Sequence, residues 1–241
     1  SKLKDANEEL ISKDKQKDEF LDTVAHELKT PITGIRAATE LLMDEDDDMP
    51  KEIKAQFLKN ILQDTDRLGR LIHNILDFEK LETGRLHLDM QYQDIQKTIL
   101  KAISSISQIA AKKEVKIINK NPHAFNTNYD EDRILQVLTN LLSNAIKFCN
   151  TKTGVIEIDY KLGNQFVEIS VTDNGKGIPE EDHKFIFDKF YQSKHQNTIK
   201  PQGSGLGLAI TKQIVEKHNG KIWAKKDVKN GATLVFTIPF K

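Results

Sequence analysis

The order of hydrophobic and polar residues changes about one third of the way along the chain. Up to about residue 83, apolar residues recur every three or four positions, which is the period of an amphipathic helix that packs against a partner. From about residue 86, short alternating runs typical of strands are interleaved with helical patterns, and most of the glycines lie there. The sequence therefore predicts a helical region followed by an α/β region.

The helical region is predicted to contain two long helices joined by an acidic turn, DEDDDMPK at residues 44–51. The hydrophobic seam consists of Leu21, Val24, Leu28, Ile35, Ala38 and Leu42 in the first helix and Phe57, Ile61, Leu68, Leu71, Ile75 and Phe78 in the second. A second stripe follows beside it: Leu58, Leu62, Ile72 and Leu76. This face is too wide for one partner helix, so we expect two copies of the hairpin to form a dimeric four-helix bundle.

Three segments are predicted along the chain. Residues 1–20 continue the helical period with polar interruptions, as a weak incoming coiled coil, and residues 21–83 form the hairpin. Residues 86–241 form an α/β sandwich, in which helices cover one face of a mixed sheet. Its predicted strands lie near 86–92, 115–119, 124–128, 154–162, 165–173, 220–226 and 231–239, and its helices near 94–111, 130–149, 180–186 and 205–218. The polar, uncapped beginning indicates an excerpt of a longer protein.

Composition narrows the class of function. The 36 basic and 36 acidic residues balance, so there is no electrostatic case for binding nucleic acid or an anionic membrane. No apolar run approaches the roughly 18 residues that a membrane span needs. The single cysteine, Cys149, indicates a reducing compartment.

A histidine lies on the solvent side of the first helix, in the stretch FLDTVAHELKTPITGIR. Glu27 could accept a hydrogen bond from one imidazole nitrogen of His26 and leave the other as a nucleophile. Thr30, one turn further on the same face, could hold a water or a substrate. Pro31 has no N–H for the carbonyl of Glu27, so it weakens or kinks the helix there. The remaining histidines lack metal-ligand spacing and are expected at the surface or in packing.

Polar residues in the second region match a polyphosphate with its cation. Asn140, Asn144 and Lys147 lie on one ridge of a helix that is otherwise apolar, although exposed asparagines also occur without any function. Three glycines, Gly203, Gly205 and Gly207, lead into a helix whose N-terminal N–H groups could receive phosphate. Alone, this Gly-rich pattern is weak evidence.

A third cluster, VTDNGKGIP, follows a predicted strand. Asp173 could accept a hydrogen bond from an exocyclic amine such as that of adenine. Gly175 and Gly177 would let the backbone approach a flat base closely, and the alternative is a plain glycine turn.

In their order and spacing, these motifs resemble those of the two-component sensor histidine kinases. FLDTVAHELKTPIT is similar to the H box of that family, NLLSNAIKF to the N box, DNGKG to the G1 box, FDKFYQ to the F box and GSGLGL to the G2 box. The resemblance implies a dimerisation and histidine-phosphotransfer hairpin over residues 21–83. It implies an ATP-binding domain of the Bergerat type over residues 86–241.

The resemblance also implies roles for individual residues. His26 would be the phosphoacceptor and Glu27 its general base, and Asn144 with Asn140 would bind Mg²⁺. The implied ATP-binding residues are Asn140, Asn144, Lys147, Asp173, Gly175, Gly177, Phe187, Phe190, Gly203, Gly205, Leu206 and Gly207. Among them, Lys147 would contact phosphate and Asp173 the adenine amine. Phe187 and Phe190 would anchor a lid over residues 188–204, and Lys189, Lys194 and Lys200 stay open as the lysine that meets the γ-phosphate.

The expected function is therefore an ATP-dependent histidine kinase. It would act as a homodimer and pass phosphoryl from His26 to an aspartate of a response regulator's receiver domain. The resemblance places it as the cytoplasmic portion of a membrane-attached bacterial sensor kinase, with its sensor domain absent from this chain. Two alternatives stay open: a module that mainly dephosphorylates the regulator, with Thr30 orienting water, and a nucleotide-gated dimeric scaffold.

Overall fold

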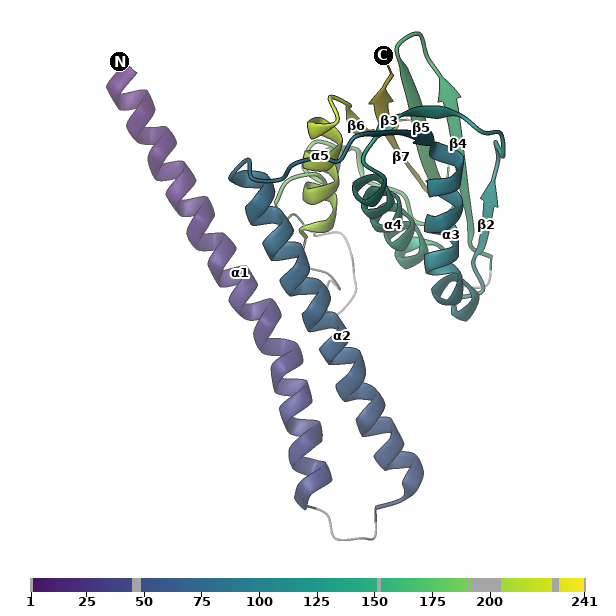
Figure 1. The fold of residues 1–241 in the computed structure, drawn as a ribbon. Helices are drawn as coiled ribbons and strands as arrows, with labels where there is room; N and C mark the ends of the chain where they lie inside the picture. Colours follow the sequence, from purple (N-terminus) through teal and green to yellow (C-terminus); the bar gives the residue numbers. More distant parts are fainter. Residues whose placement is uncertain are drawn as a thin grey trace. The chain divides into compact units, whose positions relative to one another are not determined.

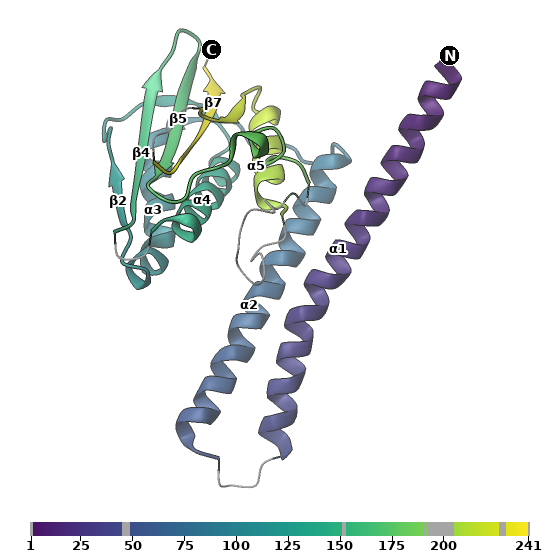
Figure 2. The same ribbon diagram turned by 180° about the vertical axis from the view of Figure 1, so that it is seen from behind.

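The computed structural model describes residues 2–44, 49–150, 153–189, 191, 205–226 and 230–240 (Figures 1 and 2). They form two compact units that divide between Phe78 and Glu79. None of the helices in this described part of the chain is long and apolar enough to cross a membrane.

The first unit is a hairpin of two long helices, as expected. Helix α1 spans Lys2–Asp44 and α2 spans Lys51–Glu82, and they run side by side in both views. Pro31 lies inside α1, which continues through it. Within the predicted seam, Ala38, Leu71 and Phe78 are each no more than 7% exposed, most of the other residues are partly buried, and Leu21 is 52% exposed. The acidic residues 45–48 lie outside the described part.

The second unit is built on a mixed five-stranded sheet, which confirms the predicted architecture. Its order is β2-β4-β5-β7-β6; β2 and β4 are parallel and the other neighbours antiparallel. The strands are β2 (Lys116–Asn119), β4 (Val155–Leu162), β5 (Phe166–Asp173), β6 (Ile222–Ala224) and β7 (Ala232–Pro239). Helices α3 (Ile95–Lys112), α4 (Glu131–Phe148) and α5 (Gly207–Lys217) cover one face (Figure 1).

Two short elements differ from the expected bounds. The strand expected near 86–92 begins only at Gln91: β1 (Gln91–Asp94) pairs with β3 (Asn126–Tyr129) in a separate two-stranded sheet. Leu86, at the start of the expected strand, is instead a buried residue in an irregular segment. The helix expected near 180–186 is a single 3₁₀ turn, Glu180–Asp182, followed by further turns.

The core lies between the sheet and the three helices. Along β4 and β5 every second residue is buried, because one face of the pleated sheet meets the helices while the other carries polar side chains. Fully buried side chains come from both layers: Ile95, Ile99, Ile134, Leu138, Leu142, Ile156, Ile158, Ile169 and Phe236. This burial fixes the ends of α4, β5 and α5, which carry most of the predicted nucleotide-binding residues.

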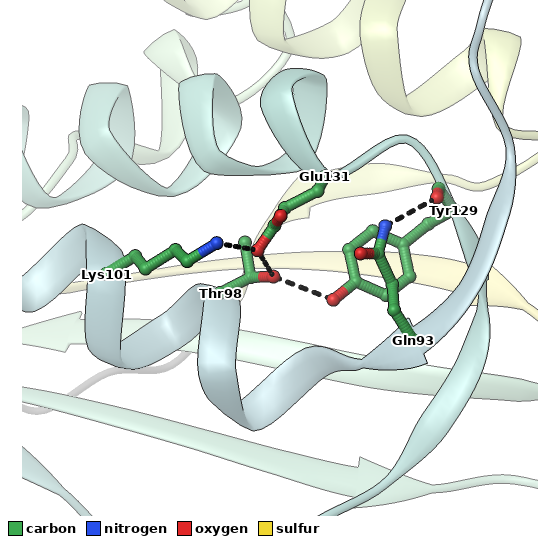
Figure 3. Close-up of polar contacts among 5 residues, drawn as sticks. All are labelled: Gln93, Thr98, Lys101, Tyr129 and Glu131. Atoms are coloured by element: carbon green, nitrogen blue, oxygen red, sulfur yellow. Dashed lines mark hydrogen bonds and ion pairs between the residues drawn. The ribbon is translucent and has the colours of Figure 1, made fainter.

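A chain of polar contacts joins β3 to the first turns of α3 and α4 (Figure 3). The hydroxyl of Tyr129, a fully buried residue, lies 2.7 Å from Thr98 Oγ1, and Thr98 donates to Glu131 Oε1 at 3.3 Å. Lys101 Nζ donates to the same carboxylate oxygen at 2.6 Å. Gln93 Nε2 donates to the backbone oxygen of Tyr129 at 3.0 Å. Burial raises the pKa of Tyr129 to about 12, so the phenol stays a donor in this network.

A buried histidine holds the beginning of α4. The backbone N–H of Asp130 donates to His218 Nε2 at 3.1 Å, so this nitrogen is an acceptor and the proton is on Nδ1. Nδ1 lies 2.8 Å from the oxygen of Ile214 and donates to it. Asp130 itself caps α4, because its Oδ1 accepts from the N–H of Arg133 at 3.0 Å. Only the neutral ring of His218 can accept at Nε2 and donate at Nδ1 together, so the residue packs here in its uncharged form.

The neutral state of His218 predicts a pH dependence of stability. Burial lowers the pKa of His218 from 6.5, so the unfolded chain binds more protons than the folded chain below that pH. The free energy of unfolding should therefore decrease as the pH falls below 6.5. Urea unfolding between about pH 5 and pH 8 measures this slope. His218→Gln should make the slope shallower, and an unchanged slope would contradict the assignment.

Candidate functional site

In the first unit, His26 is exposed on α1, as the seam predicted. Glu27 is largely buried, with 16% of its side chain exposed, and its Oε2 accepts from Arg67 Nη2 of α2 at 3.0 Å. Thr30 Oγ1 donates to the carbonyl oxygen of His26 at 3.2 Å. The hydroxyl of Thr30 is therefore engaged with the backbone of its own helix, an arrangement that often bends a helix. Arg67 is a neighbour that the sequence pattern did not indicate.

In the second unit, Asn140 joins α4 to the start of α5. Its Nδ2 donates to the carbonyl oxygen of Gly207 at 3.3 Å and to Thr211 Oγ1 at 3.4 Å. Thr211 also donates to Gly207 at 2.9 Å, so both side chains fix the first turn of α5. Because the nitrogen of Asn140 is occupied, its carbonyl oxygen is the atom left for a ligand.

Asn144 and Lys147 continue the same ridge, and both are half-buried. Burial and then the nearby charge of Lys113 lower the pKa of Lys147. Lys147 Nζ also lies 4.8 Å from the ring centre of Phe148. A partly desolvated cation next to a second cation is a favourable site for an anion such as phosphate.

Asp173 ends β5 and is 7% exposed. Its Oδ1 accepts from the N–H of Gly175 at 2.8 Å. Burial raises the pKa of Asp173, against the opposing effect of the N–H groups of Gly175 and Ala232. A buried carboxylate at the end of a strand is suited to accept from a ligand amine, which would compensate part of its lost hydration.

The glycines after Asp173 let the loop approach other backbone segments of the protein, and not only a ligand. A Cβ at Gly175 would overlap the carbonyl oxygen of Phe148, at the end of α4. Gly177 has φ +78° and Gly231 has φ +82°, and a Cβ at Gly231 would overlap the carbonyl oxygen of Asp173. The close approaches therefore pack the loop onto α4 and β7. Gly231 was missed, although the Asn-Gly pair before its strand is a turn signal.

Asn174 was also missed, and it fastens this loop to the beginning of β4. Its Oδ1 accepts from the N–H of Val155 at 2.9 Å, and its Nδ2 donates to the oxygen of Thr153 at 2.7 Å. Cys149 Sγ lies 3.0 Å from the same Oδ1, which agrees with the expected packing role of the cysteine. Asn174 thus keeps Asp173 at a fixed place beside the end of α4.

The residues around the beginning of the predicted lid are held by contacts within the second unit. Phe187 is 8% exposed, and the hydroxyl of Tyr191 donates to Asp182 Oδ1 at 2.5 Å. Lys189 Nζ donates to Glu82 Oε2 at 2.8 Å, so this lysine is paired with a carboxylate. Phe190, Gly203, Lys194 and Lys200 lie outside the described residues.

The other end of the predicted lid leads into α5. Gly205 has φ +69°, Leu206 is fully buried and Gly207 begins the helix. A helix start leaves backbone N–H groups without intrahelical partners, and these can bind phosphate.

Two family models match the chain, and together they cover most of it. "His Kinase A (phospho-acceptor) domain" matches residues 16–84. "Histidine kinase-, DNA gyrase B-, and HSP90-like ATPase" matches residues 129–241. The chain belongs to the sensor histidine kinase family.

Relatives and solved structures agree with this family. The chain is 34% identical over 230 residues to the sensor histidine kinase WalK of Bacillus subtilis. The aligned region covers 95% of the chain and 37% of that protein. It is 33% identical to a WalK of Staphylococcus aureus, covering 94% of the chain and 54% of that protein. The chain thus spans about a third to a half of the length of these relatives.

Two solved histidine kinases have the same fold. The histidine kinase ThkA, in complex with the response regulator protein TrrA, is similar with a TM-score of 0.71 and 30% identity, covering 92% of this chain and 61% of that one. The histidine kinase AdeS of Acinetobacter baumannii has a TM-score of 0.71 at 22% identity, over 90% of this chain and 98% of that one.

The residues of this histidine kinase domain fit ATP with a bound cation. No group of three or more His, Cys, Asp or Glu that could hold a metal occurs among the described residues. Asn140 and Asn144 could hold a cation through their amide oxygens, which are ligands that Mg²⁺ accepts. Lys147 and the start of α5 fit the phosphates, and Asp173 fits an adenine amine.

Replacing Asp173 by asparagine should weaken the binding of ATP without lowering the stability of the folded protein. We expect the Kd for ATP to rise about 10- to 100-fold, since a hydrogen bond to a charged acceptor is lost. The free energy of unfolding should not decrease at pH 7, because burial raises the pKa of Asp173 and the ionised carboxylate therefore opposes folding.

Calorimetric titration with ATP and urea unfolding measure the two quantities. Asp159→Asn is the matched control, because it removes one carboxylate from the neighbouring strand β4. An unchanged Kd in Asp173→Asn would contradict the adenine role.

Proposed function

We propose that this chain is the kinase portion of a sensor histidine kinase. It transfers the γ-phosphoryl group of ATP to His26 and then to an aspartate of a response regulator. The observation that carries the proposal is that one chain holds both an exposed histidine, next in sequence to a glutamate, and a domain that matches the histidine kinase-like ATPase family. A scaffold that only binds nucleotide would need just the second of these.

The proposed reaction is a displacement at phosphorus. The unprotonated ring nitrogen of His26 forms a bond to the γ-phosphorus, the bond from that phosphorus to the bridging oxygen breaks, and ADP leaves with the electron pair. Positive charge develops on the ring, and Glu27 accepts the proton of the other ring nitrogen. Mg²⁺, when bound, neutralises charge on the phosphates. Catalysis is otherwise mostly positioning.

Asn140 supports transfer to a histidine over hydrolysis. Its amide donates to Gly207 and Thr211, and an amide cannot take a proton from water. With no general base at this position, the phosphoryl group is kept for an external nucleophile. We therefore assign Asn140 to cation binding and to holding α5 in place.

A second copy of the chain is the proposed partner of the hairpin. In one chain the second stripe of α2 stays exposed: Leu58 by 54%, Leu62 by 62%, Ile72 by 45% and Leu76 by 49%. Regularly spaced leucines and isoleucines on one helix face favour burial against another hairpin, as in a four-helix bundle.

The acceptor after His26 is proposed to be a receiver-domain aspartate. Support comes from the similarity of this chain to the histidine kinase ThkA, whose solved structure is a complex with a response regulator protein. A phosphoramidate is a reactive phosphoryl donor, so it suits onward transfer to a carboxylate. His26 is exposed, which leaves the donor accessible.

Incubation with γ-labelled ATP and Mg²⁺ tests the proposed function. We expect one labelled protein, with the label lost in acid and retained in alkali, as a phosphoramidate requires. Adding a purified receiver domain should move the label to that protein. Absence of label, or label that survives acid, would contradict the kinase assignment.

A further inference from the structure

Glu27 is held from across the hairpin by an arginine that belongs to the other helix. Arg67 Nη2 of α2 donates to Glu27 Oε2 of α1 at 3.0 Å. The exposed fractions of the two side chains are 39% and 16%, so the pair is partly shielded from water. Partly buried charge pairs are screened less than surface pairs, and an arginine holds a carboxylate in a defined direction.

The contact uses one carboxylate oxygen and leaves the other. Among the described residues, the hydrogen-bond partner of Glu27 is Arg67, through Oε2. Oε1 is therefore open to accept from a second donor. His26 precedes Glu27 directly in α1, and its imidazole has no hydrogen-bond partner in this part of the chain. The carboxylate of Glu27 thus has one oxygen bound by the arginine and a second oxygen that can accept from another donor.

The hairpin itself brings these residues together. Glu27 and Gly34 are seven residues apart on α1 and so lie on the same helix face. A Cβ at Gly34 would come within 2.5 Å of Asp64 Oδ2, so this face meets α2 at a second point, one turn from Arg67. The position of Arg67 therefore follows from the packing of α1 on α2, and sequence spacing alone could not have indicated it.

We propose that Arg67 is a positioning residue for the phosphorylation of His26. It orients the carboxylate by donating to Glu27 Oε2 and leaves Oε1 to accept the ring proton. Nucleophile, base and orienting group then form the three-part arrangement of other activated nucleophiles. The inference rests on the proposed kinase function, in which Glu27 is the base.

A double-mutant cycle in the full chain tests this inference. Arg67→Ala should lower kcat for autophosphorylation roughly 10-fold, a part of the 10²- to 10⁴-fold that a positioned base contributes. The KM for ATP should not change, and Arg67→Lys should restore part of the rate. In a Glu27→Gln background, Arg67→Ala should lower kcat no further, because the arginine acts through Glu27.

Arg70→Ala is the matched control, since Arg70 is an exposed arginine one turn further along α2. It should keep the wild-type rate, and urea unfolding should show similar stability for it and Arg67→Ala. Equal losses from Arg67→Ala in both backgrounds would mean a structural role and overturn the inference, as would an unchanged rate. If Glu27→Gln alone kept the full rate, the proposed base would be wrong, which is a separate failure.

Discussion

Replacing His26 by glutamine should abolish acid-labile labelling by ATP while leaving nucleotide binding intact. His26 is exposed on α1 in the first unit, whereas the residues that fit ATP belong to the second. Glutamine keeps polar atoms and a good helix propensity, but it has no nucleophilic ring nitrogen. We therefore expect no phosphoramidate, a Kd for ATP within about twofold of wild type and an unchanged free energy of unfolding, because surface substitutions usually have small effects.

His73→Gln is a suitable control for this variant. His73 lies on α2 with 70% of its side chain exposed, so it is a second surface histidine of the hairpin. Autophosphorylation should continue in it at the wild-type rate. Labelled His26→Gln protein would show that another residue accepts the phosphoryl group. Loss of ATP binding in His26→Gln would show that the residue matters for the fold and would leave its chemical role unsupported.

The elements that could be predicted from the sequence are those whose residue pattern reflects burial alone. Helix α4 and strands β4, β5 and β7 begin and end within a few residues of the expected positions, because α4, β4 and β5 each have one continuous buried side and β7 is buried along most of its length. The short β1 was placed too early, since the apolar residues at Leu86 and Leu88 anchor an irregular segment. Short apolar runs do not distinguish a strand from such an anchor.

The candidate site was predictable only in part, for a related reason. Residues whose chemistry is unusual for their element, such as His26 on a helix surface or Asp173 at a strand end, can be recognised in the sequence. Arg67 and Asn174 have ordinary residue types for their places. They matter because the fold brings them to Glu27 and to Val155, which are distant in the chain. Contacts of this kind depend on the tertiary structure and leave no local pattern.

Gly231 is the position where a single methyl group should do the most damage. Its φ of +82° is strained for any residue with a side chain, and an added Cβ would overlap the backbone oxygen of Asp173. The oxygen is part of the backbone at the end of β5, and the added Cβ would be attached directly to the backbone next to the paired start of β7. Neither atom can therefore rotate away. We expect Gly231→Ala to lower the free energy of unfolding by about 3 kcal/mol. ATP binding should weaken as well, because any relief of the overlap displaces Asp173.

Gly207→Ala separates this mechanism from a general effect of losing a glycine. Gly207 is helical, and an added Cβ would meet its nearest atom, Asn140 Oδ1, at 3.7 Å, an ordinary contact. The free energy of unfolding of Gly207→Ala should differ from that of the wild type by less than about 1 kcal/mol. The single tryptophan, Trp223, pairs with Val235 of β7 and reports unfolding of this sheet by fluorescence. Equal stability of the two variants would mean that the turn before β7 can relax. Asp173 would then owe its position to Asn174 and Gly175 rather than to the close packing of Gly231.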